Sequence, residues 1–372
     1  MSCESVLRTR LRQRRGSRTD LPVTTGNGAT AGGPAIVCVP FPHTTTMDDP
    51  VESADNAALD ALYDRAYATF DNGELQQASA LFGELAALRP NLAYPHYMRG
   101  LAHKYLRDWP ASLQHNLRAQ EVQEEFDEAS AWNAGIAATA LGDWAEARRQ
   151  WAQCGITVPE GEGPIERDFG MVSVRLNPWG SSETVYARRI DVVRARLLNV
   201  PLPESGHRLF DIVLHDGAKT GERRLGDGTV PVFNVLQTLQ RSDHRTYVAF
   251  VQCPTIEDKE ALEEAELPGI GFVEDWTHSI RHLCLRCSYG VPHLEEHPKD
   301  DTDAGNDDWQ AERQLGIGAQ GKAAVERLLA DWVAAGPGRR VDALESREVD
   351  AEGPAEGSVW WRGPEEDEPD QG

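Results

Sequence analysis

A short stretch of the sequence combines cysteines and histidines at spacings that suit a metal ion. Two thiolates separated by two residues reach one ion from a tight turn, and two imidazoles complete the tetrahedral set that Zn2+ prefers. The short gap between the cysteine pair and the histidine pair leaves open that His278, His282 or Cys253 supplies one ligand. We therefore predict a zinc site with the ligands Cys284, Cys287, His293 and His297.

The predicted zinc is expected to be structural. Its four ligands close the coordination sphere, whereas a catalytic zinc keeps one position for water. The acidic stretch from Glu295 to Asp303 offers a general base, so the alternative is a metal-dependent hydrolase in residues 165–335, with the repeats described below recruiting substrate. A buried, reduced cysteine pair and a histidine-rich surface loop also stay open as interpretations.

Two other motifs offer weaker chemistry. Gly316-x-Gly318-x-x-Gly321 matches the dinucleotide fingerprint, but it follows a helix-like segment, Trp309–Leu315, where the fingerprint needs a strand. These glycines are therefore expected to end one helix and begin the next.

A hydrolase triad is the other weak signal, and its members would be Ser205, His207, His215 and Asp216. No nucleophile-elbow pattern surrounds Ser205, and Asp216-Gly217 is a common turn pair. A turn is the preferred interpretation.

The elements that precede these motifs show a repeat. Three segments, which start at Leu59, Ala93 and Glu128, share one helical pattern at offsets of 34 and 35 residues. The eighth position is small in each segment, and the twenty-fourth is aromatic in the first and third. These residues are Ala66, Gly100 and Gly135, and Phe82, Asn116 and Trp151. A small residue lets two helices approach, and the larger one fills the adjoining space, so the period predicts three stacked helix–turn–helix units.

This spacing resembles the tetratricopeptide (TPR) repeat family over residues 53–159. The resemblance implies a concave face lined by the first helix of each unit, where a protein or peptide partner binds. The residues expected to contact the partner are Tyr63, Tyr67, Tyr94, Tyr97, Lys104 and Trp132. The alternative is that several of these aromatic side chains pack between repeats. The lysine and asparagine set with which some family members clamp a peptide carboxylate is not evident.

Residues 165–335 change to alternating strand patterns separated by turn residues. Strands are predicted at Met171–Leu176, Thr184–Arg189, Arg194–Val200, Phe210–His215, Thr229–Leu236, Thr246–Cys253 and Gly271–Glu274. Helices are predicted at Glu257–Glu266 and Lys322–Ala335. The short connections indicate an α+β domain with a mostly antiparallel sheet.

Both ends of the sequence are predicted to be disordered. Residues 1–52 form an arm with an arginine-rich start, and Met47 is an alternative first residue. Residues 336–372 form an acidic tail rich in glycine and proline. The dipeptide Trp360-Trp361 in this tail is either a short partner-binding motif or part of a tail without function.

Charge and composition restrict the function. The net charge of −23 argues against a nucleic acid or an anionic membrane surface as partner. No apolar run approaches the roughly 18–20 residues of a membrane span, and six cysteines in 372 residues do not make a disulfide scaffold. We therefore expect a cytoplasmic adaptor protein with helical repeats, an α+β domain and disordered ends.

Overall fold

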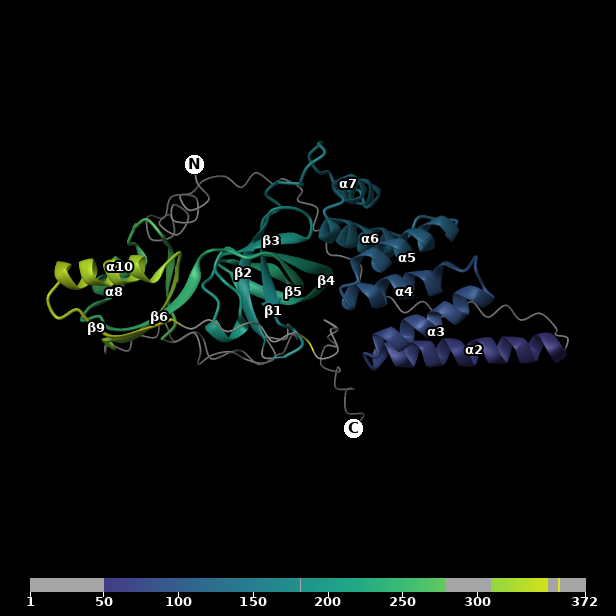
Figure 1. Cartoon of the computed structure of the whole chain (residues 1–372), viewed down its shortest axis with the longest axis horizontal. Helices are drawn as coiled ribbons and strands as arrows, with labels where there is room; N and C mark the ends of the chain where they lie inside the picture. The colour runs from purple at the N-terminus through teal and green to yellow at the C-terminus, as the bar shows by residue number, and fades with distance from the viewer. Residues whose placement is uncertain (1–49, 181, 278–308, 347–353, 355–372) are drawn as a thin grey trace.

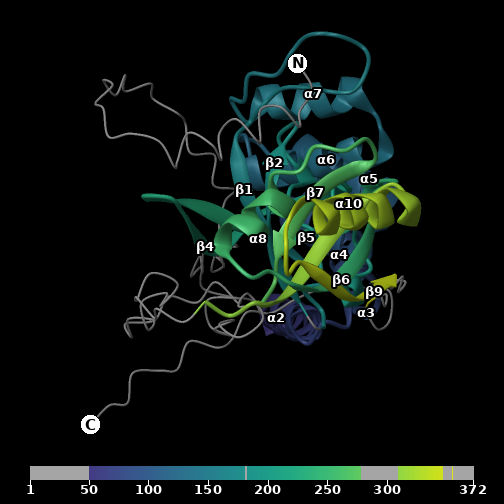
Figure 2. The same ribbon diagram turned by 90° about the vertical axis from the view of Figure 1, so that its left-hand side faces the viewer.

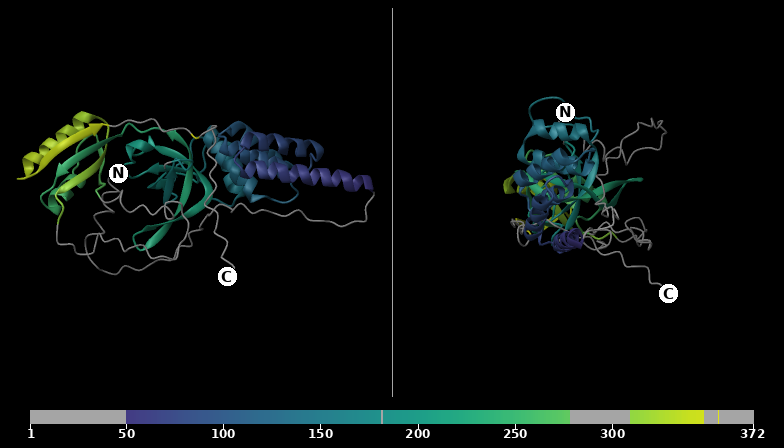
Figure 3. Two further views of the ribbon diagram at one scale, coloured as in Figure 1. Left: turned by 90° about the horizontal axis from the view of Figure 1, so that it is seen from below. Right: turned by 90° about the vertical axis from the view of Figure 1, so that its right-hand side faces the viewer.

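The computed structural model describes residues 50–180, 182–277, 309–346 and 354. Helices occupy one end of the molecule, a β-barrel lies in the middle, and a second sheet forms the other end (Figure 1, Figure 3). This order along the molecule follows the order along the chain. Among the described residues, no helix has both the length and the apolar character needed to cross a bilayer.

The helical part begins at Pro50, slightly inside the arm that was predicted to be disordered. Its helices are α2 (Pro50–Asp71), α3 (Leu75–Leu88), α4 (Ala93–Tyr105), α5 (Trp109–Val122), α6 (Glu128–Leu141) and α7 (Trp144–Gln153). Each helix packs against the next one. Aspartates cap three of them: Asp108, Asp127 and Asp143 accept hydrogen bonds from backbone N–H groups in the first turn of the helix that follows.

Close approach between paired helices depends on glycine. A Cβ atom on Gly100 of α4 would lie 2.4 Å from the side chain of Asn116 on α5. A Cβ atom on Gly135 of α6 would lie 2.6 Å from the ring of Trp151 on α7. The small eighth position and the larger twenty-fourth position therefore meet, as the repeat pattern predicted.

The barrel closes five strands around an apolar interior. These are β1 (Met171–Leu176), β2 (Glu183–Arg189), β3 (Arg194–Leu197), β4 (Ile212–Leu225) and β5 (Gly228–Gln240), with a short 3-10 helix η1 (Pro203–Ser205) between β3 and β4. Neighbouring strands pair antiparallel, and β1 closes the barrel by pairing with β5 in parallel. Buried side chains such as Val174, Val213 and Phe233 form its core.

The second sheet is fully antiparallel and has the order β7-β8-β6-β9. Its elements are β6 (Arg245–Gln252), α8 (Ile256–Glu263), β7 (Ile270–Asp275), β8 (Glu312–Ala319), α10 (Lys322–Ala335) and β9 (Arg340–Ser346). This βαββαβ order is the ferredoxin-like arrangement. Both helices cover the outer face of the sheet (Figure 2). On the inner face, Val248 and Phe250 of β6 pack with Val200 and Leu209, which lie in the connection between β3 and β4.

The region after the helices therefore departs from the prediction in two ways. Residues 165–335 were expected to form one α+β domain, but they contain a barrel followed by most of a separate sheet. The sheet also continues into the predicted disordered tail, because Arg340–Ser346 form β9. Polar residues dominate this edge strand, and a sequence of this kind is typical of a disordered tail.

The glycine motif was also placed on the wrong element. Residues 312–319 form a strand, β8, and not the end of a helix. Gly316 and Gly318 lie in this strand, where added Cβ atoms would come within 2.1 Å of Trp276 and 2.5 Å of Leu209. These two glycines thus serve close packing inside the sheet, and this explains their spacing without a nucleotide.

Candidate partner-binding site

The six residues predicted to contact a partner fall into two groups in the structure. Tyr63 and Tyr67 of α2 and Tyr94 of α4 are partly buried and pack against the helical core. The other three, Tyr97, Lys104 and Trp132, lie on α4 and α6, and the last two are buried against the barrel or close to it.

A buried ion pair joins the second group to the barrel. Lys104 Nζ donates to Asp216 Oδ1 at 2.8 Å, and Tyr105 Oη donates to Asp216 Oδ2 at 3.1 Å. The backbone N–H of Gly217 donates to the same carboxylate at 2.7 Å. Burial alone would raise the pKa of Asp216, but the Lys104 ammonium and these hydrogen bonds lower it below its usual value. The carboxylate is therefore ionised and neutralised inside the protein.

Asp216 and Gly217 sit in an irregularity of β4. The pairing of β4 with β5 shifts between His215 and Lys219, so the intervening residues leave the regular ladder. The sequence had suggested a turn for this pair, and the structure instead has a continuous strand with a local bulge. Because the bulge redirects the strand, Asp216 points toward α4.

Tryptophans complete this contact between helices and barrel. The indole of Trp132 packs on Gly217, where a Cβ atom would lie 1.8 Å from Nε1. Trp109 Nε1 donates to Gln237 Oε1 of β5 at 2.7 Å. The guanidinium of Arg194 lies 4.6 Å from the ring centre of Trp144. We call the contacts of Lys104, Trp109, Trp132 and Trp144 with the barrel the helix–barrel junction.

One hydrophobic core runs through this junction. Helix residues such as Leu101, Ile136 and Trp151 belong to the same buried cluster as Leu214 of β4 and Leu236 of β5. Burial raises the pKa of Tyr97, which faces this region, to about 12, with smaller contributions from Asp127 and Asp216. The chain's own barrel therefore covers the part of the helical face where Lys104 and Trp132 were expected to meet a partner.

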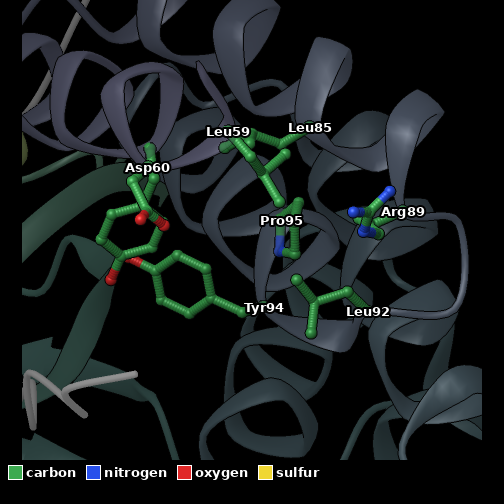
Figure 4. A pocket seen from close by; sticks show the side chains of 8 residues that line it. Leu59, Asp60, Leu85, Arg89, Leu92, Tyr94 and Pro95 are labelled. Carbon is green, nitrogen blue, oxygen red and sulfur yellow. The ribbon is translucent and has the colours of Figure 1, made fainter. Parts of the chain in front are cut away.

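The first group borders a hollow between α2, α3 and α4 (Figure 4). It is shallow and open to solvent, and we call it the α2–α4 hollow. The rings of Tyr63 and Tyr94 lie 5.4 Å apart, and Tyr63 stacks on Tyr67 at 6.3 Å. The hollow is lined by Leu59, Asp60, Tyr63, Leu85, Arg89, Leu92, Tyr94 and Pro95.

The composition of the hollow suits a peptide. Leucines and a proline form an apolar floor, and two tyrosines supply aromatic contact area. Asp60 and Arg89 are exposed and place one charge of each sign beside the floor. An apolar side chain with charged neighbours can thus be bound in one orientation.

The predicted zinc ligands Cys284, Cys287, His293 and His297 lie outside the described residues, as do His278 and His282. Their segment connects two paired strands, since β7 ends before it and β8 begins after it. Cys253 is described and lies in the core of the second sheet, where burial raises the pKa of its thiol to about 11. Within residues 50–180, 182–277 and 309–346, no three histidine, cysteine or acidic side chains converge as a metal site would require.

The weak hydrolase triad is not assembled. Ser205 Oγ donates to the carbonyl of Leu202 at 2.8 Å. His207 Nε2 lies 3.3 Å from Asn177 Oδ1, and Asp216 is held at the helix–barrel junction. These side chains therefore serve separate structural contacts.

Sequence reasoning missed the barrel side of the junction. The sequence of Asp216 and Gly217 is typical of a turn, and Gln237 directly follows the predicted strand Thr229–Leu236. The one sequence feature that indicates a bulge here is Gly217 next to Asp216, because glycine is common at bulges. Comparison with protein-family models and with curated proteins found no match for this chain.

Proposed function

We propose that this chain is an adaptor protein that holds a peptide segment of a partner protein in the α2–α4 hollow. In this proposal helices α2 to α7 are TPR-like repeats, and the barrel fixes them as a platform. The hollow itself carries the proposal, since it joins an apolar floor, paired tyrosine rings and two opposite charges. Lys104 and Trp132 are assigned to the helix–barrel junction, and Tyr97 lies beside it.

Tyrosines are suited to this role. They offer large contact areas and few rotatable bonds, so little conformational entropy is lost on binding. The rings of Tyr63 and Tyr94 are tilted against each other, and both residues line the hollow. The repeats fix the distance between α2 and α4, and so the site is organised before a partner arrives.

Partner capture from a cell extract tests the proposal. The double substitution Tyr63→Ala and Tyr94→Ala should remove the specific partners that the full chain retains. The matched control is Phe126→Ala, because Phe126 is 59% exposed in the connection between α5 and α6 and lies outside the hollow. Circular dichroism should show that both variants remain helical. An identical set of captured proteins for all three chains contradicts the proposal.

A structural zinc ion is the second part of the proposal. The segment of 31 residues from 278 to 308 joins two paired strands, and a closed Cys2His2 site would order such a long connection. The ligands proposed are Cys284, Cys287, His293 and His297. Residues 165–335 then stabilise the platform and carry no catalysis.

Metal analysis of the purified full chain separates this proposal from the metal-dependent hydrolase. Replacing Cys284 and Cys287 by serine should remove one equivalent of zinc and lower the thermal stability of the chain. His244→Gln serves as control, since His244 pairs with Asp243 at a distance of 3.0 Å and is not a proposed ligand. A chain that keeps its metal in a site with an open position for water would favour the hydrolase.

A further inference from the structure

We propose that Arg99 and His115, with His103 beside them, bind an oxyanion of the phosphate class. The three residues lie where α4 packs against α3 and α5. None of them lines the α2–α4 hollow. The proposed anion site is therefore independent of the proposed peptide site and gives the chain a second kind of ligand.

Basic side chains gather where α4 faces α5. Arg99 lies between His96 and His103 on α4, three and four residues away, so the three share one side of that helix. On α5, the ring of His115 lies 5.5 Å from the ring of His103, and Arg118 follows one turn later. A cationic cluster of this kind stands out in a chain with a net charge of −23 and favours an anionic ligand.

The guanidinium of Arg99 is half-buried and has no counter-ion among the described residues. It lies against α3, where its Cζ atom is 3.6 Å from the position of a Cβ atom on Gly83. Its Nε atom is shielded from solvent and has no hydrogen-bond partner in the described part of the chain. Because a cation that is partly removed from water is costly without a partner, a bound anion would stabilise Arg99.

The two histidines differ in their contacts. His103 is fixed, since its Nε2 lies 3.0 Å from Ser79 Oγ of α3 and its Nδ1 lies 3.1 Å from Asp108 Oδ2. His115 is partly exposed and makes no hydrogen bond to residues 50–180, 182–277 or 309–346. Its ring nitrogens are therefore available to a ligand next to Arg99.

Protonation of His115 is coupled to anion binding. Burial, then the charges of Arg99 and His103, lower the pKa of His115 to about 4, so the ring is neutral at pH 7. His96 also opposes protonation, whereas Asp108 favours it. A dianion beside the ring offsets the charge of Arg99 and raises this pKa. Binding then takes up a proton, and the affinity increases as the pH falls.

A tetrahedral oxyanion fits these groups better than a carboxylate does. A guanidinium donates two parallel hydrogen bonds to two oxygens of one phosphoryl group, and a third oxygen remains for the imidazole. A carboxylate has only two oxygens to share between Arg99 and His115. The ligand is therefore a phosphate ion or a phosphorylated side chain.

Titration of the full chain with sodium sulfate tests the site, because sulfate stays a dianion between pH 5 and pH 8. Nuclear magnetic resonance of isotope-labelled histidine, at constant ionic strength, should show saturable shifts for His103 and His115. Arg99→Gln should weaken sulfate binding at least about tenfold, since it removes the charged fork. Arg327→Gln is the matched control, because Arg327 is exposed and pairs with Asp331 in α10. It should leave the affinity unchanged.

A second pair of measurements separates a lost site from a lost fold. Arg99→Lys keeps the charge without the fork and should retain part of the affinity. Lowering the pH from 7.5 to 5.5 should strengthen sulfate binding at least about threefold. His115→Gln should remove most of this increase.

Two further probes identify the source of the phosphoryl group. Inorganic phosphate and a blocked glycine–phosphoserine–glycine peptide are compared at pH 7. Tighter binding of the peptide identifies a phosphorylated side chain as the ligand, and tighter binding of phosphate identifies the free ion.

The inference is overturned if sulfate and both phosphate probes give no saturable shift, or if Arg99→Gln binds sulfate as tightly as the unchanged chain. The variant Tyr63→Ala with Tyr94→Ala should keep its sulfate binding. If partner capture does not depend on these tyrosines while sulfate still binds, the proposed function falls and the anion site stands.

Discussion

The ammonium group of Lys104 lies 2.8 Å from the carboxylate of Asp216, although 112 residues separate the two in the sequence. Both side chains are almost fully buried, at 4% and 6% exposure. The pair connects α4 to β4 and coincides with a hydrophobic core that the helices share with the barrel. The helical part and the barrel therefore behave as one packed unit.

Breaking this ion pair should destabilise the protein strongly. Lys104→Met leaves the Asp216 carboxylate buried without its cation, which typically costs about 3–5 kcal/mol of unfolding free energy. The double variant Lys104→Met with Asp216→Leu should lose less unfolding free energy than the two single variants together, because no charge stays buried alone. Urea unfolding of the single and double variants measures these differences. Arg327→Ala is the control, since its pair with Asp331 is exposed and its loss should change stability by less than about 0.5 kcal/mol.

Gly217→Ala should destabilise the helix–barrel junction, because the added methyl group has no space beside Trp132. The new methyl group would overlap the indole of Trp132, at 1.8 Å from Nε1. Overpacking of this kind costs about 1–3 kcal/mol, visible as a lower thermal midpoint. Gly163→Ala is the matched control, because no atom lies within 4 Å of its Cβ position. Equal midpoints for the two variants would refute the close contact.

Stability should fall as the pH rises from about 4.5 to about 8 through Glu183. Burial, and then the charge of Glu274, raise the pKa of Glu183 to about 8, against an ordinary value of 4.5. The folded state thus binds more protons than the unfolded state in this window, and stability decreases with pH. Glu183 is half-buried, so solvent reduces the effect. Urea unfolding at pH 5, 7 and 9 should show a flatter profile for Glu183→Gln than for the unchanged chain.

Protonation of His115 should lower the stability of the protein as the pH falls below about 6.5. Burial, then the charges of Arg99 and His103, lower the pKa of His115 from 6.5 to about 4. The unfolded state therefore binds more protons between these values, and stability is lost as the pH falls from about 6.5 to about 4. His115→Gln should reduce this loss. Thermal midpoints of the unchanged chain and of His115→Gln at pH 7, 6 and 5 measure this loss. If the midpoints of the two chains fall by the same amount with pH, the expected protonation is contradicted.

The helical part was predictable because its signal is local and periodic. Gly135 and Trp151 are sixteen residues apart, and a short turn at Gly142 folds α7 back on α6 so that the two residues meet. Helix α10 was predicted with its observed bounds, since its apolar residues recur at helical spacing and Gly321 and Gly336 flank it. β9 and β8 were missed because strand propensity depends on the neighbouring strand, and a single polar or glycine-rich strand carries little of that information.

The sequence by itself determined that the chain contains paired helices with small contact positions, a strand-rich region after residue 165 and a cluster of potential zinc ligands. Only the tertiary structure decided which surface of the helices remains for a partner. Lys104 and Trp132 have the residue types of a binding face, and their actual contacts depend on a bulge in β4 more than eighty residues away. Such contacts arise from the docking of two elements, and this docking has no period that a sequence pattern can show.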